Sequence, residues 1–437
     1  MMCLSRAASL LLVFATHIAA EDKPIFDKVL YSTHASLGLD NLHKTWYNNN
    51  TGLWGELWWN SANALTTVCD LVPVDQLSSR QCAVNQYRVL IENTFSQAQH
   101  VEVRTFKSRN LDNGGMMESH YCINGVGGAC ALKRDGSLIK RGFKNFLNNF
   151  YDDEGWWALA LIRAWDVTNN QTYLEAAATI FEDMKTGLGG PCNGGIYWSK
   201  DRQYVNAIAN ELYLTVAASL AVRVPGEKTF LQTAKDQWSW FSKSGMINSD
   251  NLINDGLDGN CKNNGQATWT YNQGVILGGL VELSRATNDK SLLDEASKIA
   301  KAAIGKFSNK DGILEENGGC EYQPGRCGQD GQQFKGVFIR NLNYLQLAAP
   351  DEQFRSFILK NADAIWDKDC QDCTSKDVAL LGVAWAGPYF NATMPTQSSA
   401  LDAIVAAVYV APGGKQVEVP RPSTTHLFDK TYSKEDS

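Results

Sequence analysis

Two consecutive carboxylates, Asp152 and Asp153, stand where a polar loop gives way to an apolar run that begins at Ala158. Cleavage of a glycosidic bond with retention needs two carboxyl groups about 5 to 5.5 Å apart, one to attack the sugar and one to protonate the leaving oxygen. Consecutive residues in a first helical turn project about 100° apart, so both can face one cleft. On a strand they would point to opposite faces. The pair therefore predicts nucleophilic and acid/base chemistry on a sugar.

The same residues also have a purely structural interpretation. Unpaired N–H groups and the helix dipole favour anions at a helix N-terminus, and an Asp before an apolar run is an ordinary capping signal. Spacing alone favours capping, and we expect Glu154 to be a partner of the dipole rather than a third catalytic acid. The two interpretations are compatible, because the helix end that is capped can also keep a nucleophile ionised.

Four other stretches place polar and aromatic residues at or just before the start of a helix. Asn206 and Asn210 are four residues apart and share a helix face, although buried amides of this kind can also tie helices together. Residues 271–273 could cap a helix, and Lys335 and Arg340 could be surface cations. The four stretches are Gly194–Ser199 with Tyr204–Leu212, Trp269–Gly274, Phe334–Asn341 and Ser398–Asp402.

Tryptophan favours the binding interpretation. The chain has thirteen tryptophans, and several fall at loop–helix junctions rather than within helices. An indole beside carboxylates and amides suits stacking on the C–H face of a sugar while the amides bond its hydroxyl groups. The combination predicts a neutral polysaccharide as the substrate. The junction residues are Trp58, Trp59, Trp156, Trp157, Trp198 and Trp269.

The overall charge supports a neutral partner. Forty Lys and Arg residues against forty-seven Asp and Glu residues give a formal net charge of −7. A chain with excess negative charge has no general electrostatic attraction for nucleic acid or for anionic lipid. We therefore expect neither of these as a partner.

The two ends of the chain differ from its middle. Residues 1–20 combine Arg6, a short apolar run and a small-residue cleavage site, which is the pattern of a signal peptide. No linker interrupts residues 21–411, which we expect to form a single catalytic domain, and residues 412–437 are a polar tail without the hydrophobic end of a GPI signal. We expect a secreted monomer, extracellular or associated with the cell wall, without a stable membrane anchor.

Ten cysteines follow residue 20, and an even count in a secreted chain suggests disulfides. Local spacing suggests the pairs 69–82, 122–130, 320–327 and 370–373, which leaves 192 with 261, although the sequence does not prove this connectivity. Cys370-Gln-Asp-Cys373 could instead be half of a zinc or redox site, but no second such pair and no histidine cluster accompanies it. The sequons at Asn49, Asn170 and Asn391 predict N-glycosylation.

Helical periodicity dominates the chain, and β-alternation is nearly absent. About a dozen helices without heptads or a strict period predict a closed toroid of helical hairpins rather than a superhelical repeat array. The long Gly- and Asn-rich segment 109–149 is expected to form a cleft wall. Helices are predicted at about 26–46, 62–68, 85–103, 153–167, 171–186, 202–222, 227–243, 268–286, 290–304, 333–348, 351–366 and 397–410.

Five motifs, in order along the chain, resemble glycoside hydrolase family 76, the endo-α-1,6-mannanases. The resemblance spans about residues 27–410 and implies an all-α fold, an (α/α)6 toroid of six helical hairpins, that cleaves internal α-1,6-mannosidic bonds with retention. It also implies Asp152 as the nucleophile, Asp153 as the acid/base, and no metal or organic cofactor. The motifs are Tyr151–Ala160, Gly194–Trp198, Asn206–Leu212, Trp269–Gly274, and Phe334–Gly336 with Arg340.

Physical chemistry agrees with two different roles for the two carboxylates. The helix N-terminus would hold one ionised, while the negative charge of the neighbour raises the pKa of the other so that it stays protonated. Such a pair titrates as a unit, so which residue has which role stays open. The residues expected to bind the substrate are Trp58, Trp59, Trp156, Trp198, Asn206, Asn210, Tyr271, Asn272, Gln273, Lys335 and Arg340.

Three other functions compete with a secreted retaining endo-α-1,6-mannanase. One is a cell-wall transglycosidase acting on GPI-type or wall mannosides, similar to a yeast-type branch that typically carries Asp-Asp-Gln followed by Phe-Trp, a pattern from which Glu154 and Trp156 depart. Another is a non-catalytic sugar-binding homologue, against which the intact acidic pair argues. The last is a uronate hydrolase or lyase, whose basic subsite would have to come from Lys335 and Arg340.

Overall fold

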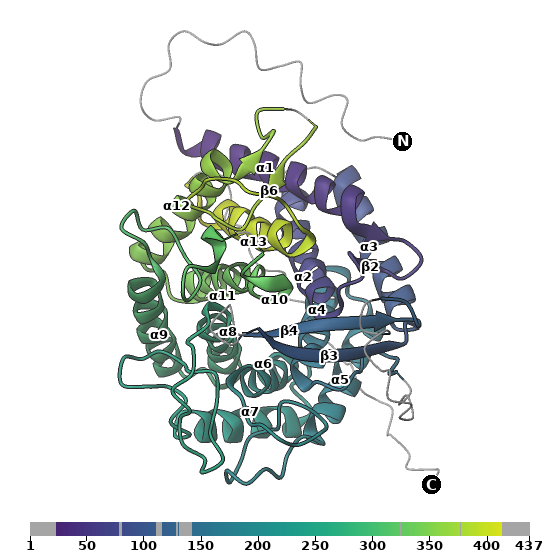
Figure 1. Cartoon of the computed structure of the whole chain (residues 1–437), viewed down its shortest axis with the longest axis vertical. Coiled ribbons are helices and arrows are strands. Elements are labelled where there is room, and N and C mark those ends of the chain that lie inside the picture. The colour runs from purple at the N-terminus through teal and green to yellow at the C-terminus, as the bar shows by residue number, and fades with distance from the viewer. Residues whose placement is uncertain are drawn as a thin grey trace.

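Two concentric sets of helices form a ring in the computed structural model, which describes residues 23–77, 81–110, 116–127, 130, 142–323, 325–375 and 377–412 (Figure 1). The inner set is α2 (Trp58–Leu77), α4 (Tyr151–Thr168), α6 (Ala207–Arg223), α8 (Thr270–Thr287), α11 (Phe334–Ala348) and α13 (Met394–Val410). The outer set is α1 (Lys23–Trp46), α3 (Gln81–Ala98), α5 (Gln171–Lys185), α7 (Lys228–Phe241), α9 (Ser291–Phe307) and α12 (Glu352–Lys368). The expected signal peptide, residues 1–20, and the tail beyond residue 412 lie outside the described residues.

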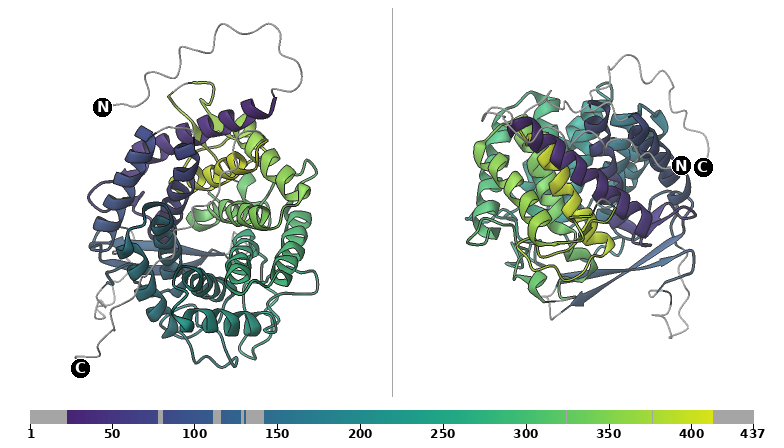
Figure 2. Two further views of the ribbon diagram at one scale, coloured as in Figure 1. Left: turned by 180° about the vertical axis from the view of Figure 1, so that it is seen from behind. Right: turned by 90° about the horizontal axis from the view of Figure 1, so that it is seen from above.

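The ring is closed. Each inner helix packs against the next in the order α2, α4, α6, α8, α11, α13, and α13 packs against α2. The outer helix that follows each of the first five inner helices packs beside it, and α1 at the other end of the chain packs beside α13. The closed ring is also visible from behind (Figure 2). The prediction of an all-α (α/α)6 toroid is confirmed.

Burial separates the two sets of helices. Nearly every residue of α6 is buried, because this helix has neighbours all round. In α9 the buried residues instead recur at spacings of three and four, from Leu292 and Leu293 to Ile304 and Phe307, which is the pattern of a helix with one face on the core. Of the helices in the described part of the chain, none combines the length and apolarity needed to span a membrane.

Two glycines allow inner helices to approach one another closely. A Cβ atom on Gly274 of α8 would lie 2.6 Å from the Cα of Phe338 on α11. A Cβ atom on Gly336 of α11 would lie 2.5 Å from the Cα of Ser399 on α13. Both glycines belong to motifs that the sequence analysis singled out, and their place in those motifs is explained by packing.

The connections on the two ends of the ring differ in length. Short turns lead from an inner helix to the outer helix that follows it, for example residues 169–170 between α4 and α5. Long connections lead from an outer helix to the next inner helix, namely residues 99–150, 186–206, 242–269, 308–333 and 369–393. The long connections therefore gather around the N-terminal ends of the inner helices.

The first long connection contains a β-hairpin that the sequence analysis missed. β3 (Val103–Asn110) pairs antiparallel with β4 (Met116–Ile123), and the hairpin lies across one end of the ring (Figure 1). The prediction of a helix up to Val103 is wrong, because α3 ends at Ala98. Pairing between strands is a longer-range contact that helical periodicity does not report. Two further strand pairs are very short, β1 (Tyr47–Asn48) with β2 (Leu53–Trp54) and β5 (Cys370–Gln371) with β6 (Leu380–Leu381).

Four of the five suggested disulfides are present, namely 122–130, 192–261, 320–327 and 370–373. The suggested pair 69–82 is wrong. Cys69 is a free thiol buried on α2, and burial raises its pKa well above the usual range. A short sequence separation favours the pair with Cys82, but Cys69 is buried in the hydrophobic core.

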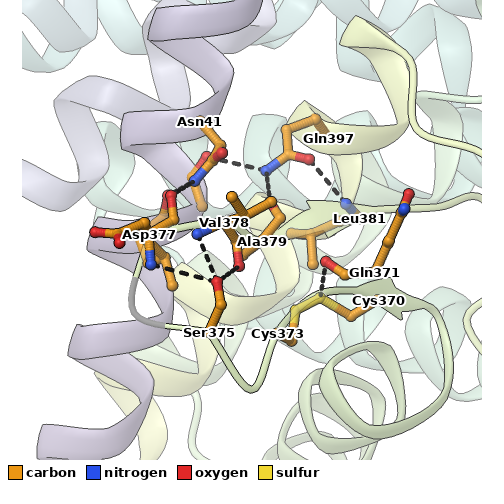
Figure 3. The surroundings of a disulfide bond; sticks show 12 residues. Asn41, Cys370, Gln371, Cys373, Ser375, Asp377, Val378, Ala379, Leu381 and Gln397 are labelled. Carbon is orange, nitrogen blue, oxygen red and sulfur yellow. Dashed lines mark hydrogen bonds between the residues drawn. A yellow bond between two sulfur atoms is a disulfide. The ribbon is translucent and has the colours of Figure 1, made fainter.

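The segment around the Cys370–Cys373 disulfide helps to join the two ends of the described chain (Figure 3). Gln397 at the start of α13 donates hydrogen bonds to the carbonyl oxygens of Gly38 on α1 and of Ala379, at 2.9 and 3.0 Å. Its side-chain oxygen accepts from the amide of Leu381 at 2.8 Å. One buried amide therefore links α13, α1 and β6.

Candidate active site

The carboxylate of Asp152 lies in the first turn of α4, at the end of the ring where the long connections gather. Its Oδ1 accepts a hydrogen bond from the backbone amide of Asp153 at 3.0 Å. Its Oδ2 accepts from the indole N–H of Trp198 at 2.7 Å and from the ammonium of Lys107 at 3.2 Å. The N-cap residue of α4 is Phe150, which makes no side-chain cap. The carboxylate thus faces the aromatic and basic groups of other elements rather than serving only its own helix.

Local backbone pairing explains how Trp198 reaches the start of α4. Phe150 and Ser199 form an isolated antiparallel bridge, and the amide of Tyr151 donates to the carbonyl oxygen of Trp198 at 3.0 Å. The amide of Trp198 in turn donates to the carbonyl oxygen of Tyr204 at 2.7 Å. This pairing holds the second long connection, residues 186–206, against the loop that precedes α4.

Asp153 is more deeply buried than its neighbour, with 1% of its surface exposed. Its Oδ2 accepts a hydrogen bond from the amide side chain of Asn148 at 2.6 Å, and its Oδ1 accepts from Lys107 at 3.1 Å. Burial raises the pKa of Asp153 to about 7, with the charge of Asp152 adding to the rise and that of Lys107 opposing it. This carboxyl can therefore carry a proton near neutral pH.

Lys107 is the residue that sequence reasoning missed most clearly. It lies on β3, with 6% of its side chain exposed, and contacts both carboxylates. Its ammonium also lies 4.6 Å from the ring centre of Phe150 and 5.0 Å from that of Trp198. Burial acts to lower the pKa of Lys107, but the neighbouring carboxylates hold it above its usual range. No local pattern in the sequence marks this lysine, because its position depends on the hairpin.

Glu154 is structural in the fold. Its Oε1 accepts hydrogen bonds from the backbone amide of Asn148 at 2.9 Å and from the ammonium of Lys200 at 2.8 Å. It is fully buried beneath the loop that precedes α4, and burial raises its pKa well above the usual range. The two contacts fix the loop that delivers Asn148 to Asp153.

A cavity of about 510 Å³ opens above the two aspartates. Ligand sites typically occupy about 300 to 1,000 Å³ and combine apolar walls with a few polar groups. Its apolar walls come from Trp59, Trp156, Trp198, Trp269, Tyr271 and Phe334, with Met116 and Met117 of the hairpin. Its polar lining comes from Lys107, Arg109, Asp152, Asp153, Tyr204, Asn206, Asp255, Gln266 and Asp330.

Five residues expected to bind the substrate line this cavity: Trp59, Trp156, Trp198, Asn206 and Tyr271. Asn206 also caps the N-terminus of α6, since its side chain accepts a hydrogen bond from the amide of Ala209. The ring of Tyr271 stacks on that of Phe334, with ring centres 3.9 Å apart. The cap and the stack hold these side chains in place at the cavity wall.

Three other expected binding residues lie away from the cavity, and each satisfies backbone or core contacts. Trp58 is fully buried, and its ring packs on that of Trp157. Asn210 bonds to the backbone N–H and C=O of Ile196 at 2.7 and 2.9 Å. Gln273 bonds to the same two groups of Ile253, at 2.8 Å each. The amides of Asn210 and Gln273 thus fasten long connections to inner helices.

The two expected basic binding residues are also buried away from the cavity. Lys335 donates to Glu321 at 2.9 Å and to the carbonyl oxygen of Val383 at 2.7 Å. Arg340 forms an ion pair with Asp402 at 3.0 Å. Both cations therefore balance buried acids rather than forming a subsite for an acidic sugar.

Asn272, the last expected binding residue, also lies outside the cavity lining. It is fully buried on α8, and no hydrogen-bond partner among the described residues reaches its side chain.

Two acids at the cavity were not singled out from the sequence. Asp255 accepts a hydrogen bond from the hydroxyl of Tyr204 at 2.6 Å, and burial raises its pKa above the usual range. Asp330 accepts from the indole of Trp59 at 2.8 Å, and from both the amide and the hydroxyl of Ser119 at 2.9 and 2.8 Å. Asp330 thereby fastens the hairpin to the cavity wall. Neither acid follows a recognisable motif.

One group of described residues is close enough to hold a metal ion, Cys320, Glu321 and Cys327. The two cysteines are bonded to each other, so their sulfur atoms are not thiolate ligands. Glu321 is already paired with Lys335. This group therefore has the chemistry of a structural disulfide.

Proteins of similar sequence carry related names. Mannan endo-1,6-alpha-mannosidase DFG5 of Candida albicans is 26% identical over 281 residues, covering 60% of this chain and 61% of that protein. The protein of the same name from Saccharomyces cerevisiae is 30% identical over 218 residues, covering 46% of each. The chain thus spans about half to three fifths of the length of these relatives.

Solved structures share the fold. The GH76A alpha-1,6-mannanase of Salegentibacter sp. HEL1_6 matches with a TM-score of 0.64 and 21% identity, covering 87% of this chain and 99% of that one. An inactive variant of that enzyme, with two consecutive aspartates replaced by alanine, is known in complex with alpha-1,6-mannotetrose. Dfg5 from Chaetomium thermophilum, in complex with glucosamine, matches with a TM-score of 0.65 and 18% identity, covering 89% and 91%.

A sequence profile connects these similarities to the site described above. The profile of glycosyl hydrolase family 76 matches residues 138–415, which make up more than half of the chain. The match contains the Asp152–Asp153 pair and five of the six inner helices, from α4 to α13. The chain therefore belongs to glycosyl hydrolase family 76.

Proposed function

We propose that this protein is a secreted, retaining endo-α-1,6-mannanase that hydrolyses internal α-1,6-mannosidic bonds of mannan. The observation that carries the proposal is the close placement of two carboxylates in different surroundings. One oxygen of each lies within about 3.2 Å of the same ammonium group, so these two oxygens are at most about 6.3 Å apart. Retaining enzymes need about 5 to 5.5 Å between the carboxyl groups and inverting ones about 6.5 to 9.5 Å.

In the first step, the carboxylate of Asp152 attacks the anomeric carbon while Asp153 donates its proton to the leaving glycosidic oxygen. The bond from the anomeric carbon to that oxygen breaks, and a glycosyl ester on Asp152 forms. The three hydrogen-bond donors around Asp152 hold its carboxylate in a fixed orientation for attack. The raised pKa of Asp153 keeps its proton available near neutral pH.

In the second step, Asp153 accepts a proton from water, and the resulting hydroxide oxygen attacks the anomeric carbon. The ester bond to Asp152 breaks, which releases the sugar with its original configuration and restores both carboxyl groups. No other reactant is required.

The substrate class is supported by the cavity walls and by the relatives. Indole rings at Trp59, Trp156 and Trp198 offer faces and edges for sugar rings, and the polar groups among them can bond hydroxyls. The similar proteins of Candida albicans and Saccharomyces cerevisiae are named mannan endo-1,6-alpha-mannosidases. Lys335 and Arg340 form ion pairs with buried acids, so these two residues do not form a basic subsite for a uronate.

Secretion as a monomer is part of the proposal. Four disulfides and three exposed sequon residues, Asn49, Asn170 and Asn391, support an extracellular or cell-wall location with N-glycosylation.

The test is digestion of linear α-1,6-mannan by the purified mature protein, following product size and anomeric configuration. Short oligomannosides released first as the α-anomer are expected from the wild type. The matched control is the Asp152→Ala/Asp153→Ala variant, which is expected to release none. Absence of turnover by a folded wild type, or release of β-anomers, would refute the proposal.

A cell-wall transglycosidase is the second candidate, and the cavity lining favours it. Met116, Met117 and the aromatic walls make much of the cavity apolar, which favours a sugar acceptor over water at the glycosyl ester. In the same digestion, products longer than the starting oligosaccharide would identify transfer.

A further inference from the structure

We propose that Lys107 is a positioning residue of this active site, carried by the β3–β4 hairpin, which holds the two carboxylates in place and sets the proton balance between them. The proposal rests on the proposed function, because it concerns the same Asp152–Asp153 pair. It makes the hairpin part of the catalytic machinery, in addition to the inner helices that the family motifs identify.

The ammonium group of Lys107 lies between the two carboxylates and contacts both. Its Nζ lies 3.2 Å from Oδ2 of Asp152 and 3.1 Å from Oδ1 of Asp153. The aliphatic part of the side chain is enclosed, and the ammonium faces the rings of Phe150 and Trp198. A cation so placed can neutralise charge on both carboxylates at once, and burial strengthens the effect.

The hairpin is built to deliver this ammonium group. Val103, Thr105 and Lys107 alternate along β3 and point to the same face, and the first two are buried against the ring. The hydroxyl of Thr105 accepts a hydrogen bond from Asn148, which also bonds Asp153. The same asparagine, Asn148, therefore contacts both β3 and Asp153.

A second anchor lies directly across the hairpin. Lys107 pairs with Ser119 of β4 in the strand register. The amide and hydroxyl of Ser119 both bond to Asp330, which also binds the indole of Trp59 at the cavity wall. The disulfide Cys122–Cys130 links the end of β4 to Cys130, eight residues further along the chain. The position of Lys107 is thus fixed from the opposite strand.

The charge balance gives Lys107 its role in both steps. When Asp152 is ionised and Asp153 is protonated, the positive charge of Lys107 brings the total charge of the three side chains to zero. The positive charge opposes the rise in the pKa of Asp153 that burial and Asp152 cause, so this acid can also give up its proton and act as a base in the second step. Without the ammonium, Asp153 would hold its proton to higher pH.

Other charged and titratable groups surround this trio, and they stay unchanged in the test below. They are Arg109 on β3, Tyr121 on β4, Tyr204 in the connection before α6, Asp255 in the connection before α8, Tyr271 on α8, and Asp330 beside the hairpin. A change confined to Lys107 therefore isolates one positive charge.

The experiment compares Lys107→Met with wild type, since methionine keeps the length and apolar contacts of the side chain but removes the charge. The matched control is Arg104→Met, a charge loss on the same strand whose partner is the partly exposed Glu102. We measure kcat and kcat/KM on α-1,6-mannooligosaccharides against pH. In wild type, kcat/KM is expected to fall as pH rises through about 7, where Asp153 loses its proton.

For Lys107→Met, the alkaline fall in kcat/KM is expected to move up by about one to three pH units, because the opposing positive charge is gone. At pH 6 its kcat is expected to drop about tenfold or more, since Asp153 no longer yields its proton to act as a base. Arg104→Met should follow the wild-type profile. A Lys107→Met profile with its alkaline limb unmoved would overturn the proposal, and a merely structural lysine would give that result.

A second readout needs no turnover and separates this proposal from the proposed function. The ¹³C carboxyl resonance of Asp153, assigned with Asp153→Asn, is titrated in wild type, Lys107→Met and Lys107→Arg. A higher midpoint in Lys107→Met, and a midpoint near wild type in Lys107→Arg, support the lysine's role even if mannan is not the substrate. An equal midpoint in all three proteins refutes it. Lys107→Gln, which also lacks the charge, takes the place of Lys107→Met if that variant does not fold.

Discussion

At the scale of single residues, the two adjacent aspartates differ in surroundings more than in sequence position. Asp152 receives an indole N–H and a backbone N–H, while Asp153 is nearly excluded from solvent and bonded by Asn148. One helical turn therefore places the proposed nucleophile and the proposed acid in different surroundings, because consecutive side chains diverge by about 100° and meet different neighbours.

Azide should distinguish the two roles. With an aryl α-mannooligoside whose leaving group needs no proton, Asp153→Ala should still form the glycosyl ester, and azide should then capture it as the α-mannosyl azide. Asp152→Ala should instead give the β-mannosyl azide, because azide enters from the face left empty. On mannan itself, Asp153→Ala should lose about 10²- to 10⁴-fold in kcat/KM. NMR of the products gives the anomer.

The control for this pair is Asp311→Ala, at an exposed carboxylate on the connection after α9. It should turn over mannan like wild type and give no azide product. If the anomers of the two azides were exchanged, Asp152 and Asp153 would have the opposite roles.

At the scale of elements, the inner helices position the site, and their contacts leave no room for extra atoms. Gly274 lies against the backbone of Phe338, so α8 and α11 touch at the level of the cavity wall residue Tyr271. The outer helix α9 offers the opposite situation at Gly305, where a Cβ atom would meet nothing within 4 Å. The two glycines are both helical but differ in what surrounds them.

Alanine at these positions should therefore change stability in opposite directions. Gly274→Ala is expected to lower the free energy of unfolding by about 1 to 3 kcal/mol, because the backbone of α11 must move to accept the methyl group. Gly305→Ala is expected to raise it by about 0.5 to 1 kcal/mol, since alanine favours the helix and nothing clashes. Denaturant unfolding measures both, and equal effects of the same sign would contradict the packing described here.

At the scale of the whole molecule, the closed ring buries several acidic side chains. Glu316 in the connection after α9 and Asp369 after α12 are buried, and neither side-chain oxygen of Asp369 has a hydrogen-bond partner among the described residues. Burial raises the pKa of Glu316 to about 7 and that of Asp369 to about 8. The folded ring therefore binds protons that the unfolded chain releases.

This proton uptake predicts how stability depends on pH. An unfolded carboxyl loses its proton near pH 4, so between about pH 4 and pH 8 the folded state holds more protons than the unfolded state. The stability contributed by these groups is complete below pH 4 and is lost as pH rises through 7 and 8. The melting temperature should be several degrees higher at pH 5 than at pH 8, since each kcal/mol is worth roughly 2 °C.

Calorimetry of Asp369→Asn provides the check. Removing this carboxyl should reduce the difference in melting temperature between pH 5 and pH 8, whereas Asp311→Asn, at an exposed site, should leave it as in wild type. A wild type that is more stable at pH 8 than at pH 5 would rule out this account.

The sequence by itself determined the helices, the ring they form and the acidic pair. Helical periodicity is a local property, so α4, α8 and α11 lie close to their predicted limits. The position of Asp152 and Asp153 in a first helical turn likewise follows from the apolar run behind them. Three disulfides could also be predicted from short sequence separations, and the pair 192–261 from the two cysteines left over. The same argument from short separation was wrong for Cys69.

Only the tertiary structure decided which polar residues reach the cavity. Asn206 and Asn210 share a helix face by spacing, yet Asn206 lines the cavity and Asn210 is sealed beneath Ile196. Lys107 lies beside both aspartates because β3 pairs with β4 and Ser119 binds Asp330. The physical reason is the sequence separation of the contacts. A helix forms from contacts between residues three and four apart, whereas the pairing of strands and the packing of loops over the cavity depend on contacts between segments distant in the chain.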